Sequence, residues 1–225
     1  MSKLTVSAIR HRAVALLRNV DEALAKTVAD NLGMRELPDP LPLTTDQRYT
    51  TEVTQSKTLS LLALPGKVGI RTRKVAIMCA DGSNAATVQA IASPLIEQGE
   101  VVRLVGPHVG LIEAEGGELD LDTSFANSPG PVFDALVIAP GDEAIKALSG
   151  DGQALEFAKE QVRHCKPIMA IGNAQAILKA AGIPLDNPDK GMILAAQCDD
   201  KALRRFIKAL EAHRHPERET DPSAV

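Results

Sequence analysis

The chain has 225 residues, carries a formal net charge of -4 and is 44% hydrophobic but only 2% aromatic. This length and hydrophobic content are sufficient for one α/β domain and an appendage, with a core built from aliphatic side chains. The acidic balance excludes the extended basic face that nucleic acids need. With so few aromatic rings, binding by stacking on bases or sugars is also nearly excluded.

The cysteines are few and widely spaced, and support neither a zinc ribbon nor a disulfide framework: Cys79, Cys165 and Cys198. Reduced thiols of this kind fit a cytoplasmic protein. No apolar run reaches the length of a membrane span, and the first residues lack the apolar core of a signal peptide. The sequence therefore predicts a cytoplasmic protein without a membrane or nucleic-acid partner and without a bound metal.

Residues 1–34 are predicted to form two short helices, because apolar residues recur there at helical spacing. Asn19 is the expected N-cap of the second helix, with Glu22 three residues later as in a capping box. Gly33 is expected to end that helix. Two helices of this size have too little core to stand alone, so we expect this segment to dock on the rest of the chain or on another molecule.

Two other segments show no strand or helix pattern. Residues 35–72 contain four prolines among Thr, Ser, Asp and Gln, which predicts an extended linker longer than most connections within a domain. Such a linker either wraps another subunit or is mobile. Residues 213–225 are polar and are predicted to form a disordered tail.

Between residues 73 and 212 continuous apolar strands alternate with helical stretches. Strands are expected at 74–80, 101–105, 133–139, 167–171 and 191–195, with helices at 84–98, 142–148, 154–164, 174–181 and 201–212, and a small hairpin around 116–117. This alternation predicts a flavodoxin-like α/β fold, in which helices cover both faces of a parallel sheet.

The most informative stretch is residues 166–178, KPIMAIGNAQAIL, which predicts a buried strand, a tight glycine turn and a helix. In many α/β enzymes this turn is a nucleophile elbow that raises a Ser or Cys at the strand end. Here Gly172 occupies the elbow, with Asn173 after it. Glycine has no side chain that could attack a substrate, so the chain keeps the form of a catalytic site without its nucleophile.

Asp81 follows the first predicted strand, at the edge where open α/β sheets bind ligands. It is a candidate for a phosphate site or for acid/base chemistry. No glycine-rich phosphate motif follows it, however, so a turn before a helix capped by Ser83 or Asn84 is the favoured interpretation. His108, after the second strand, is a weaker candidate for the same crevice, because a single loop histidine without a fixed partner is usually a surface residue.

The cysteines are weak candidates for a nucleophile. Cys79 lies inside a predicted strand and is expected to be buried. Cys165 follows a histidine, but it precedes the fourth core strand and should therefore lie at the end of the sheet opposite the crevice. Cys198 lies near a helix start, which can lower a thiol pKa, yet it has no visible base.

The segments KVAIMCADG, FDALVIAPG and HCKPIMAIGNAQAIL resemble the class I glutamine amidotransferase-like superfamily. More specifically, the chain resembles the C-terminal domain of large-subunit catalases. LLRNVDEALAKTVADNLGM and LSLLALPGKVGIRTRKVAI are similar to what joins the haem core to that domain. The likeness covers nearly the whole chain in the same order, and the first of these two segments is the most discriminating.

The resemblance has consequences for the site. Active relatives carry a cysteine where this chain has Gly172, and in some an acidic residue matching Asp81 assists it. Both positions are therefore vestigial, and no catalytic residue is expected. The resemblance implies a non-catalytic domain that supports the stability and assembly of a haem catalase, with the haem core or other subunits contacted through residues 1–72. A homo-oligomer is expected.

The resemblance does not bring a haem site into this chain. Catalase cores hold haem through a tyrosine preceded by arginine in an R-x-x-x-Y pattern. The only tyrosine here, Tyr49, has Arg48 directly before it and Thr45 four residues before. The isolated chain is therefore expected neither to bind haem nor to decompose hydrogen peroxide. Two alternatives stay open: a stand-alone hydrolase, glyoxalase or chaperone of the superfamily that uses Cys165 or another residue, and a small-molecule sensor with a ligand near Asp81 and Gly172.

Overall fold

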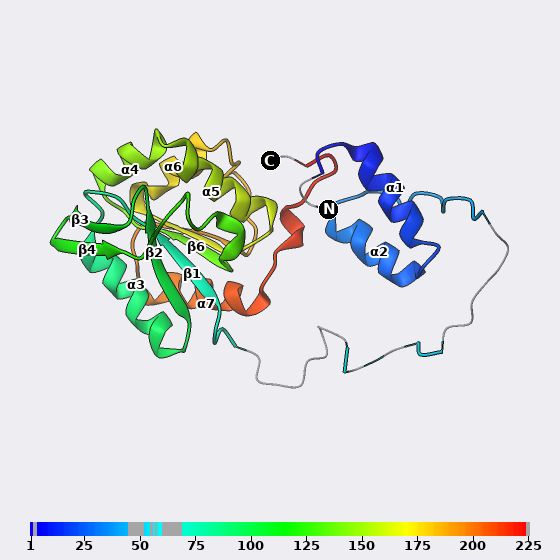
Figure 1. Ribbon diagram of the computed structural model, residues 1–225, viewed down its shortest axis with the longest axis horizontal. Helices are drawn as coiled ribbons and strands as arrows, with labels where there is room; N and C mark the ends of the chain where they lie inside the picture. Colours follow the sequence, from blue (N-terminus) through cyan, green and yellow to red (C-terminus); the bar gives the residue numbers. More distant parts are fainter. Residues whose placement is uncertain (2–3, 45–51, 55, 57, 60–68, 224–225) are drawn as a thin grey trace.

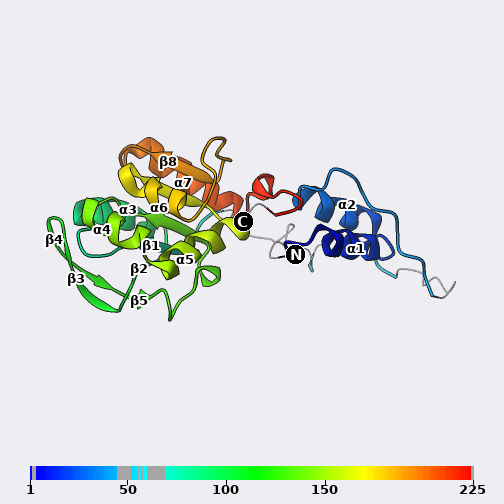
Figure 2. The ribbon, with the colours of Figure 1, turned by 90° about the horizontal axis from the view of Figure 1, so that it is seen from above.

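A computed structural model describes residues 1, 4–44, 52–54, 56, 58–59 and 69–223. Figures 1 and 2 show two parts, an α/β domain and a separate helical segment. Residues 213–223 run between these parts. Tyr49 and its neighbours Thr45 and Arg48 lie outside the described residues. None of the described helices is long and apolar enough to cross a membrane.

The helical segment, residues 4–34, contains α1 (Ser7–Leu17) and α2 (Glu22–Asn31). The prediction that Asn19 caps α2 is wrong. Asp21 is the N-cap, and its carboxylate accepts a hydrogen bond from the Leu24 amide at 2.7 Å, which satisfies one of the free N–H groups at the helix start. The Asn19 amide instead donates to the Leu41 carbonyl. Gly33 follows α2 in the left-handed region, with φ +67°.

The α/β domain is built on a six-stranded sheet in the order β5-β2-β1-β6-β7-β8, with every neighbouring pair parallel. Its strands are β1 (Lys74–Met78), β2 (Val101–Gly106), β5 (Thr123–Ser124), β6 (Ala135–Ile138), β7 (Ile168–Ile171) and β8 (Met192–Ala195). The predicted hairpin is present as β3 (Gly110–Ala114) and β4 (Gly117–Leu121), an antiparallel pair beside the main sheet.

Helices cover both faces of this sheet, as a flavodoxin-like fold requires. One face carries α3 (Ala85–Glu97) and α7 (Asp200–Ala212), and the other carries α4 (Asp142–Ser149), α5 (Gly152–Arg163) and α6 (Gln175–Ala180) (Figure 1). Short 3-10 turns are η2 (Gly130–Val132), η3 (Gly172–Ala174) and η4 (Pro216–Arg218). The predicted fold class is confirmed, and the short edge strand β5 is an element that the sequence pattern did not indicate.

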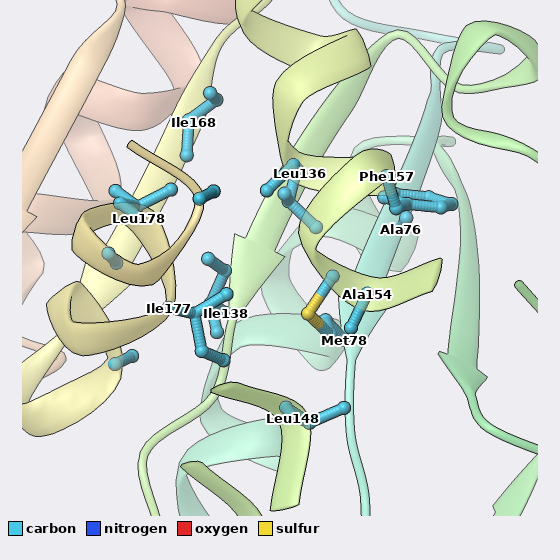
Figure 3. Close-up of a cluster of buried hydrophobic side chains, with 14 of the residues drawn as sticks. Ala76, Met78, Leu136, Ile138, Leu148, Ala154, Phe157, Ile168, Ile177 and Leu178 are labelled. Carbon is cyan, nitrogen blue, oxygen red and sulfur yellow. The ribbon is translucent and has the colours of Figure 1, made fainter. Parts of the chain in front are cut away.

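The core is aliphatic and divided into two layers by the sheet. All four residues of β6 and all four of β7 are buried, because a parallel strand between two helical layers faces protein on both sides. Figure 3 shows the layer on the α4–α6 side, where Met78 and Ile138 from the sheet lie with Leu148, Phe157 and Ile177 from the helices. Burying one such side chain stabilises the folded state by roughly 1.5–3 kcal/mol.

Residues 213–223, the described part of the tail predicted as disordered over 213–225, make defined contacts. Residues 213–223, here called the strap, leave α7, form η4 and continue to the helical segment. His215 is buried and Arg218 is ion-paired with Asp189. Part of the polar composition of the strap thus reflects buried ion pairs and hydrogen bonds. Their partners are too distant in the sequence for a local pattern to reveal them.

Candidate functional site

A crevice of about 680 Å³ lies at the carboxyl ends of the strands, where open α/β sheets bind ligands. It is bounded by the loops after β1 and β6, by the β3–β4 hairpin and by the turn after β7. Its lining consists of Asp81, Gly82, Asn84, Thr87, Glu113, Ala114, Glu115, Pro140, Gly141, Asp142, Glu143 and Asn173. The crevice therefore brings together two residues that the sequence singled out, Asp81 and Asn173, from segments about 90 residues apart.

The turn after β7 has the geometry expected of an elbow. Gly172 directly follows β7 with φ +59°, as predicted for this strand-to-helix turn. An added Cβ would lie 3.5 Å from the Ala196 carbonyl oxygen and 3.7 Å from Pro140 Cβ, which are ordinary contacts. The elbow has room for a side chain, so its lack of a nucleophile follows from the residue type and not from crowding.

Asn173 does not take over the missing role, because its amide is engaged by the neighbouring loop. Its Oδ1 accepts a hydrogen bond from the Gly141 amide at 3.3 Å, and its Nδ2 donates to Asp142 Oδ1 at 2.6 Å. Both partners lie at the start of α4. Asn173 therefore ties the elbow to the neighbouring helix terminus.

Asp81 is likewise engaged in holding a wall of the crevice. Its Oδ1 accepts a hydrogen bond from the Glu113 amide at 3.0 Å, and the Gly82 amide donates to the Glu113 carbonyl at 2.7 Å. Asn84 is the N-cap of α3, with Oδ1 accepting from the Thr87 amide. These contacts attach the β3–β4 hairpin to the loop after β1, and they agree with the interpretation of this loop as a turn before a capped helix.

Two glycines allow the loops after β1 and β6 to touch. Gly82 and Gly141 have φ values of +83° and +147°. A Cβ on Gly141 would lie 2.2 Å from the Gly82 carbonyl oxygen, closer than any side chain tolerates. Glycine is required here because only glycine combines this backbone conformation with such a close approach.

The acidity of the crevice was not predicted. Five of its lining residues are carboxylates, and within the described residues the lining contains no cysteine, serine, histidine, lysine or arginine. Glu113 and Glu115 belong to the hairpin, and the alternating acids of IEAEGGELD were the available signal. Five carboxylates favour cations and repel phosphate, so the arrangement argues against the phosphate site considered for Asp81.

The three thiols lie away from the crevice lining. Cys79 is fully buried, and burial raises its pKa to about 12. Cys165 is buried before the amino end of β7, as predicted, and burial first, then the Glu219 carboxylate, raises its pKa to about 11. Burial and the adjacent Asp199 and Asp200 also raise the pKa of Cys198. Thiols in such surroundings are poor nucleophiles, because the reactive form is the thiolate.

His108 does not join the crevice either. It is exposed, its Nδ1 lies 3.2 Å from the Val109 carbonyl oxygen, and it is not a lining residue. Elsewhere, ligand atoms of Asp189, His215 and Glu217 lie within 4.8 Å of one another. Both oxygens of Asp189, however, already accept hydrogen bonds from Arg218, which makes this group part of an ion pair.

The crevice does not fit haem. An axial ligand to haem iron is a tyrosine, histidine, cysteine or methionine side chain, and the lining of the crevice offers none of these within the described residues. Its carboxylates would also lie against the anionic propionates of a haem. No chemical step through haem can therefore be assigned to this crevice.

Comparison with known proteins connects these features to one family. The family model for the C-terminal domain found in long catalases matches residues 71–220. The match thus spans the α/β domain and most of the strap.

Curated relatives match over the whole chain. The chain is 35% identical to catalase HPII of Pseudomonas putida over 227 residues, covering 100% of this chain and 30% of the relative. Catalase HPII of Mycobacterium avium is 32% identical, with 98% of this chain and 32% of the relative covered. Catalase-B of Dictyostelium discoideum is 29% identical, with 100% and 32% covered. The chain therefore spans about a third of the length of these relatives.

A solved structure supports the fold. A two-domain protein from Anabaena variabilis, containing DJ-1/ThiJ/PfpI-like and ferritin-like domains, matches with a TM-score of 0.54 and 17% sequence identity. The match covers 63% of this chain and 48% of the other. At this identity the likeness concerns the fold alone.

Proposed function

Because the chain belongs to the family of C-terminal domains found in long catalases, we propose that it serves as a non-catalytic domain of a haem catalase. The haem and the decomposition of hydrogen peroxide belong to the part of the protein outside this chain. This domain supports the stability and assembly of the whole. The observation that carries the proposal is Gly172, which occupies a well-formed elbow without a nucleophile.

The chemistry of the crevice supports a non-catalytic role. A hydrolase of this superfamily needs a nucleophile and a base within hydrogen-bond reach of each other. Among the described residues, the crevice lining contains neither a thiol nor an imidazole. The alternative that uses Cys165 has little support, because that thiol is buried and its pKa is raised to about 11.

The helical segment supports a role in assembly. Five of its described apolar side chains are exposed, with relative accessibilities of 40–73%: Val6, Ile9, Leu16, Val20 and Leu24. An exposed apolar group of this kind marks an interaction surface. Under this proposal the haem core or a neighbouring subunit covers it. The protein would then be a cytoplasmic homo-oligomer.

Replacing Gly172 with cysteine tests the non-catalytic interpretation. We expect Gly172→Cys to fold, since an added Cβ meets only ordinary contacts, and to lose about 1–2 kcal/mol because a non-glycine residue must adopt φ +59°. We expect no esterase, peptidase or glyoxalase turnover, because no imidazole lines the crevice within the described residues and the Asp81 carboxylate already accepts a hydrogen bond from the Glu113 amide. The measurement is turnover in these three assays, together with the alkylation rate of the new thiol against pH.

Gly182→Cys is the matched control, because Gly182 has a similar φ of +74° and an added Cβ there would meet no atom within 4 Å. It reproduces the backbone strain and the extra thiol at a site outside the crevice. Turnover by Gly172→Cys above that of Gly182→Cys and of the unaltered chain would show that the crevice retains catalytic groups, and would favour the hydrolase alternative.

A further inference from the structure

The strap binds the α/β domain at its beginning. The His215 amide donates to the Cys165 carbonyl at 2.8 Å, and its ring Nε2 lies 3.1 Å from the Ala209 carbonyl oxygen. Arg218 donates to both oxygens of Asp189 at 2.8 and 2.9 Å and to the Lys166 carbonyl at 2.7 Å. Both side chains of this ion pair are less than a tenth exposed. A bidentate and buried pair of this kind fixes its backbone in position.

The next three residues of the strap bind the helical segment. Arg10 of α1 is completely buried, and donates to the Thr220 carbonyl at 2.8 Å and to the Glu219 carboxylate at 3.2 Å. Asp221 accepts from the Ser7 hydroxyl at 2.9 Å and lies 2.7 Å from His11 Nε2.

The end of α2 meets the strap as well. A Cβ on Gly33 would lie 2.4 Å from the Glu219 carbonyl oxygen, so the backbones touch where α2 ends. The strap therefore contacts the helical segment at both of its helices.

Within the described residues, the apolar core of the helical segment is separate from the two core layers of the α/β domain. This core is a cluster of a few aliphatic residues, whose described members all lie between residues 14 and 37: Val14, Leu17, Ala25, Val28, Ala29, Leu32, Met34 and Leu37. So small a core stabilises two short helices only marginally. Figures 1 and 2 both show the strap lying between this segment and the domain.

We propose that residues 215–221 form a two-sided clasp that fixes the helical segment to the α/β domain, with the buried Arg10 as the main charged contact on the segment side. The domain-binding residue Arg218 and the segment-binding residue Glu219 are adjacent in the chain, so no slack separates the two attachments. The partner of the clasp is thus the helical segment of this same chain. In a longer protein the clasp would connect the domain to whatever packs on that segment.

Arg10→Met tests the clasp, because methionine keeps much of the apolar volume and removes every donor. Hydrogen bonds to charged groups of this kind correspond to about ten- to a hundredfold in an opening equilibrium. In the whole 225-residue chain we expect amide hydrogen exchange within α1, α2 and residues 219–223 to accelerate by at least about tenfold. Exchange within β1, β6 and β7 should not change, and the radius of gyration from small-angle scattering should increase.

Arg12→Met is the matched control, since Arg12 lies on the same helix with an exposed side chain, and it should leave exchange and radius unchanged. A second variant, truncated after Arg218, removes the segment-binding side of the clasp without altering the helices and should reproduce the effect of Arg10→Met. If Arg10→Met and the truncation both leave exchange in α1 and α2 unchanged, the clasp does not hold the segment. If either change accelerates exchange equally in the central strands, these contacts belong to the domain core, and the proposal is also wrong. Neither readout requires catalase activity, so the result is separable from the proposed function.

Discussion

Replacing Glu100 with glutamine is expected to raise the free energy of unfolding above that of the unaltered chain. We expect this gain to be roughly 3–5 kcal/mol larger at pH 8 than at pH 4.5. Glu100 precedes β2 and is only 6% exposed, and neither of its carboxylate oxygens has a hydrogen-bond partner within the described structure. Burial raises the pKa of this carboxyl from 4.5 to about 8. The folded chain therefore keeps a proton on Glu100 under conditions in which the unfolded chain releases it.

The sign of the pH dependence follows from this difference in bound protons. Between pH 4.5 and 8 the folded state holds one more proton at Glu100 than the unfolded state. Its free energy of unfolding consequently falls by about 1.4 kcal/mol per pH unit through this group. The stability that the unaltered chain has with Glu100 protonated is fully present below pH 4.5 and is lost as the pH rises through 8. Glutamine is neutral at every pH and similar in shape to glutamate. The free energy of unfolding of Glu100→Gln should therefore not fall with pH through this position.

Urea unfolding of the two proteins at a series of pH values from 4.5 to 8 measures the effect. The difference in unfolding free energy between Glu100→Gln and the unaltered chain should widen steadily with pH. Glu97→Gln is the control, because Glu97 ends α3 with an exposed side chain, and its curve should follow that of the unaltered chain. Parallel curves for Glu100→Gln would mean that Glu100 is solvated.

Replacing Lys166 with methionine is expected to destabilise the fold by about 3 kcal/mol or more at pH 7. Lys166 is almost completely buried between α5 and β7, and its ammonium donates to three backbone carbonyls in and after η2: those of Gly130, Pro131 and Phe133. Burial lowers the pKa of Lys166 to about 8, so the group is still mostly protonated at pH 7 and has all three donors. Methionine fills a similar volume but leaves these carbonyls without the donor.

The free energy of unfolding at pH 7, measured with urea, tests this prediction. Lys190→Met is the matched control, because Lys190 is exposed in the loop before β8; its effect should remain within about 0.5 kcal/mol, as for most surface substitutions. A loss for Lys166→Met no larger than the control's would indicate that η2 is held by other contacts, such as the Gln161 amide that donates to the Gly130 carbonyl.

The parts of the fold that the sequence predicted well are those determined by local pattern. β1, β6 and β7 were expected from continuous apolar runs, because strands of a parallel sheet are buried on both faces. Gly172 was identified as the elbow because a strand, a glycine and a helix follow one another without interruption. At these positions the residues that set the local conformation are also the residues that are buried in the fold, so the local sequence is sufficient for the prediction.

The features that the sequence did not predict depend on contacts between distant residues. The acidic wall of the crevice exists because Asp81 binds the Glu113 amide, 32 residues further along the chain. Arg10 and Glu219 are 209 residues apart, and each alone has the appearance of a solvated surface charge. The choice of Asp21 over Asn19 as N-cap is a local matter, but both residues are good caps, and only the position at which the helix begins decides between them.

The central proposal is that this domain supports a haem catalase without taking part in its chemistry. The most direct test follows oxygen release from hydrogen peroxide, with increasing temperature, by the native assembly that contains this chain. Two further samples are measured beside it. One is the same assembly ending before residue 71, where the family match begins, and the other is the isolated 225-residue chain supplied with haem.

We predict that the native assembly releases oxygen. The truncated assembly should also release oxygen at low temperature, but it should be inactivated at a lower temperature than the native assembly. The isolated chain should release none and should cause no shift of the haem Soret band. Oxygen release with stoichiometric haem binding by the isolated chain, or identical inactivation temperatures for the two assemblies, would contradict the proposal.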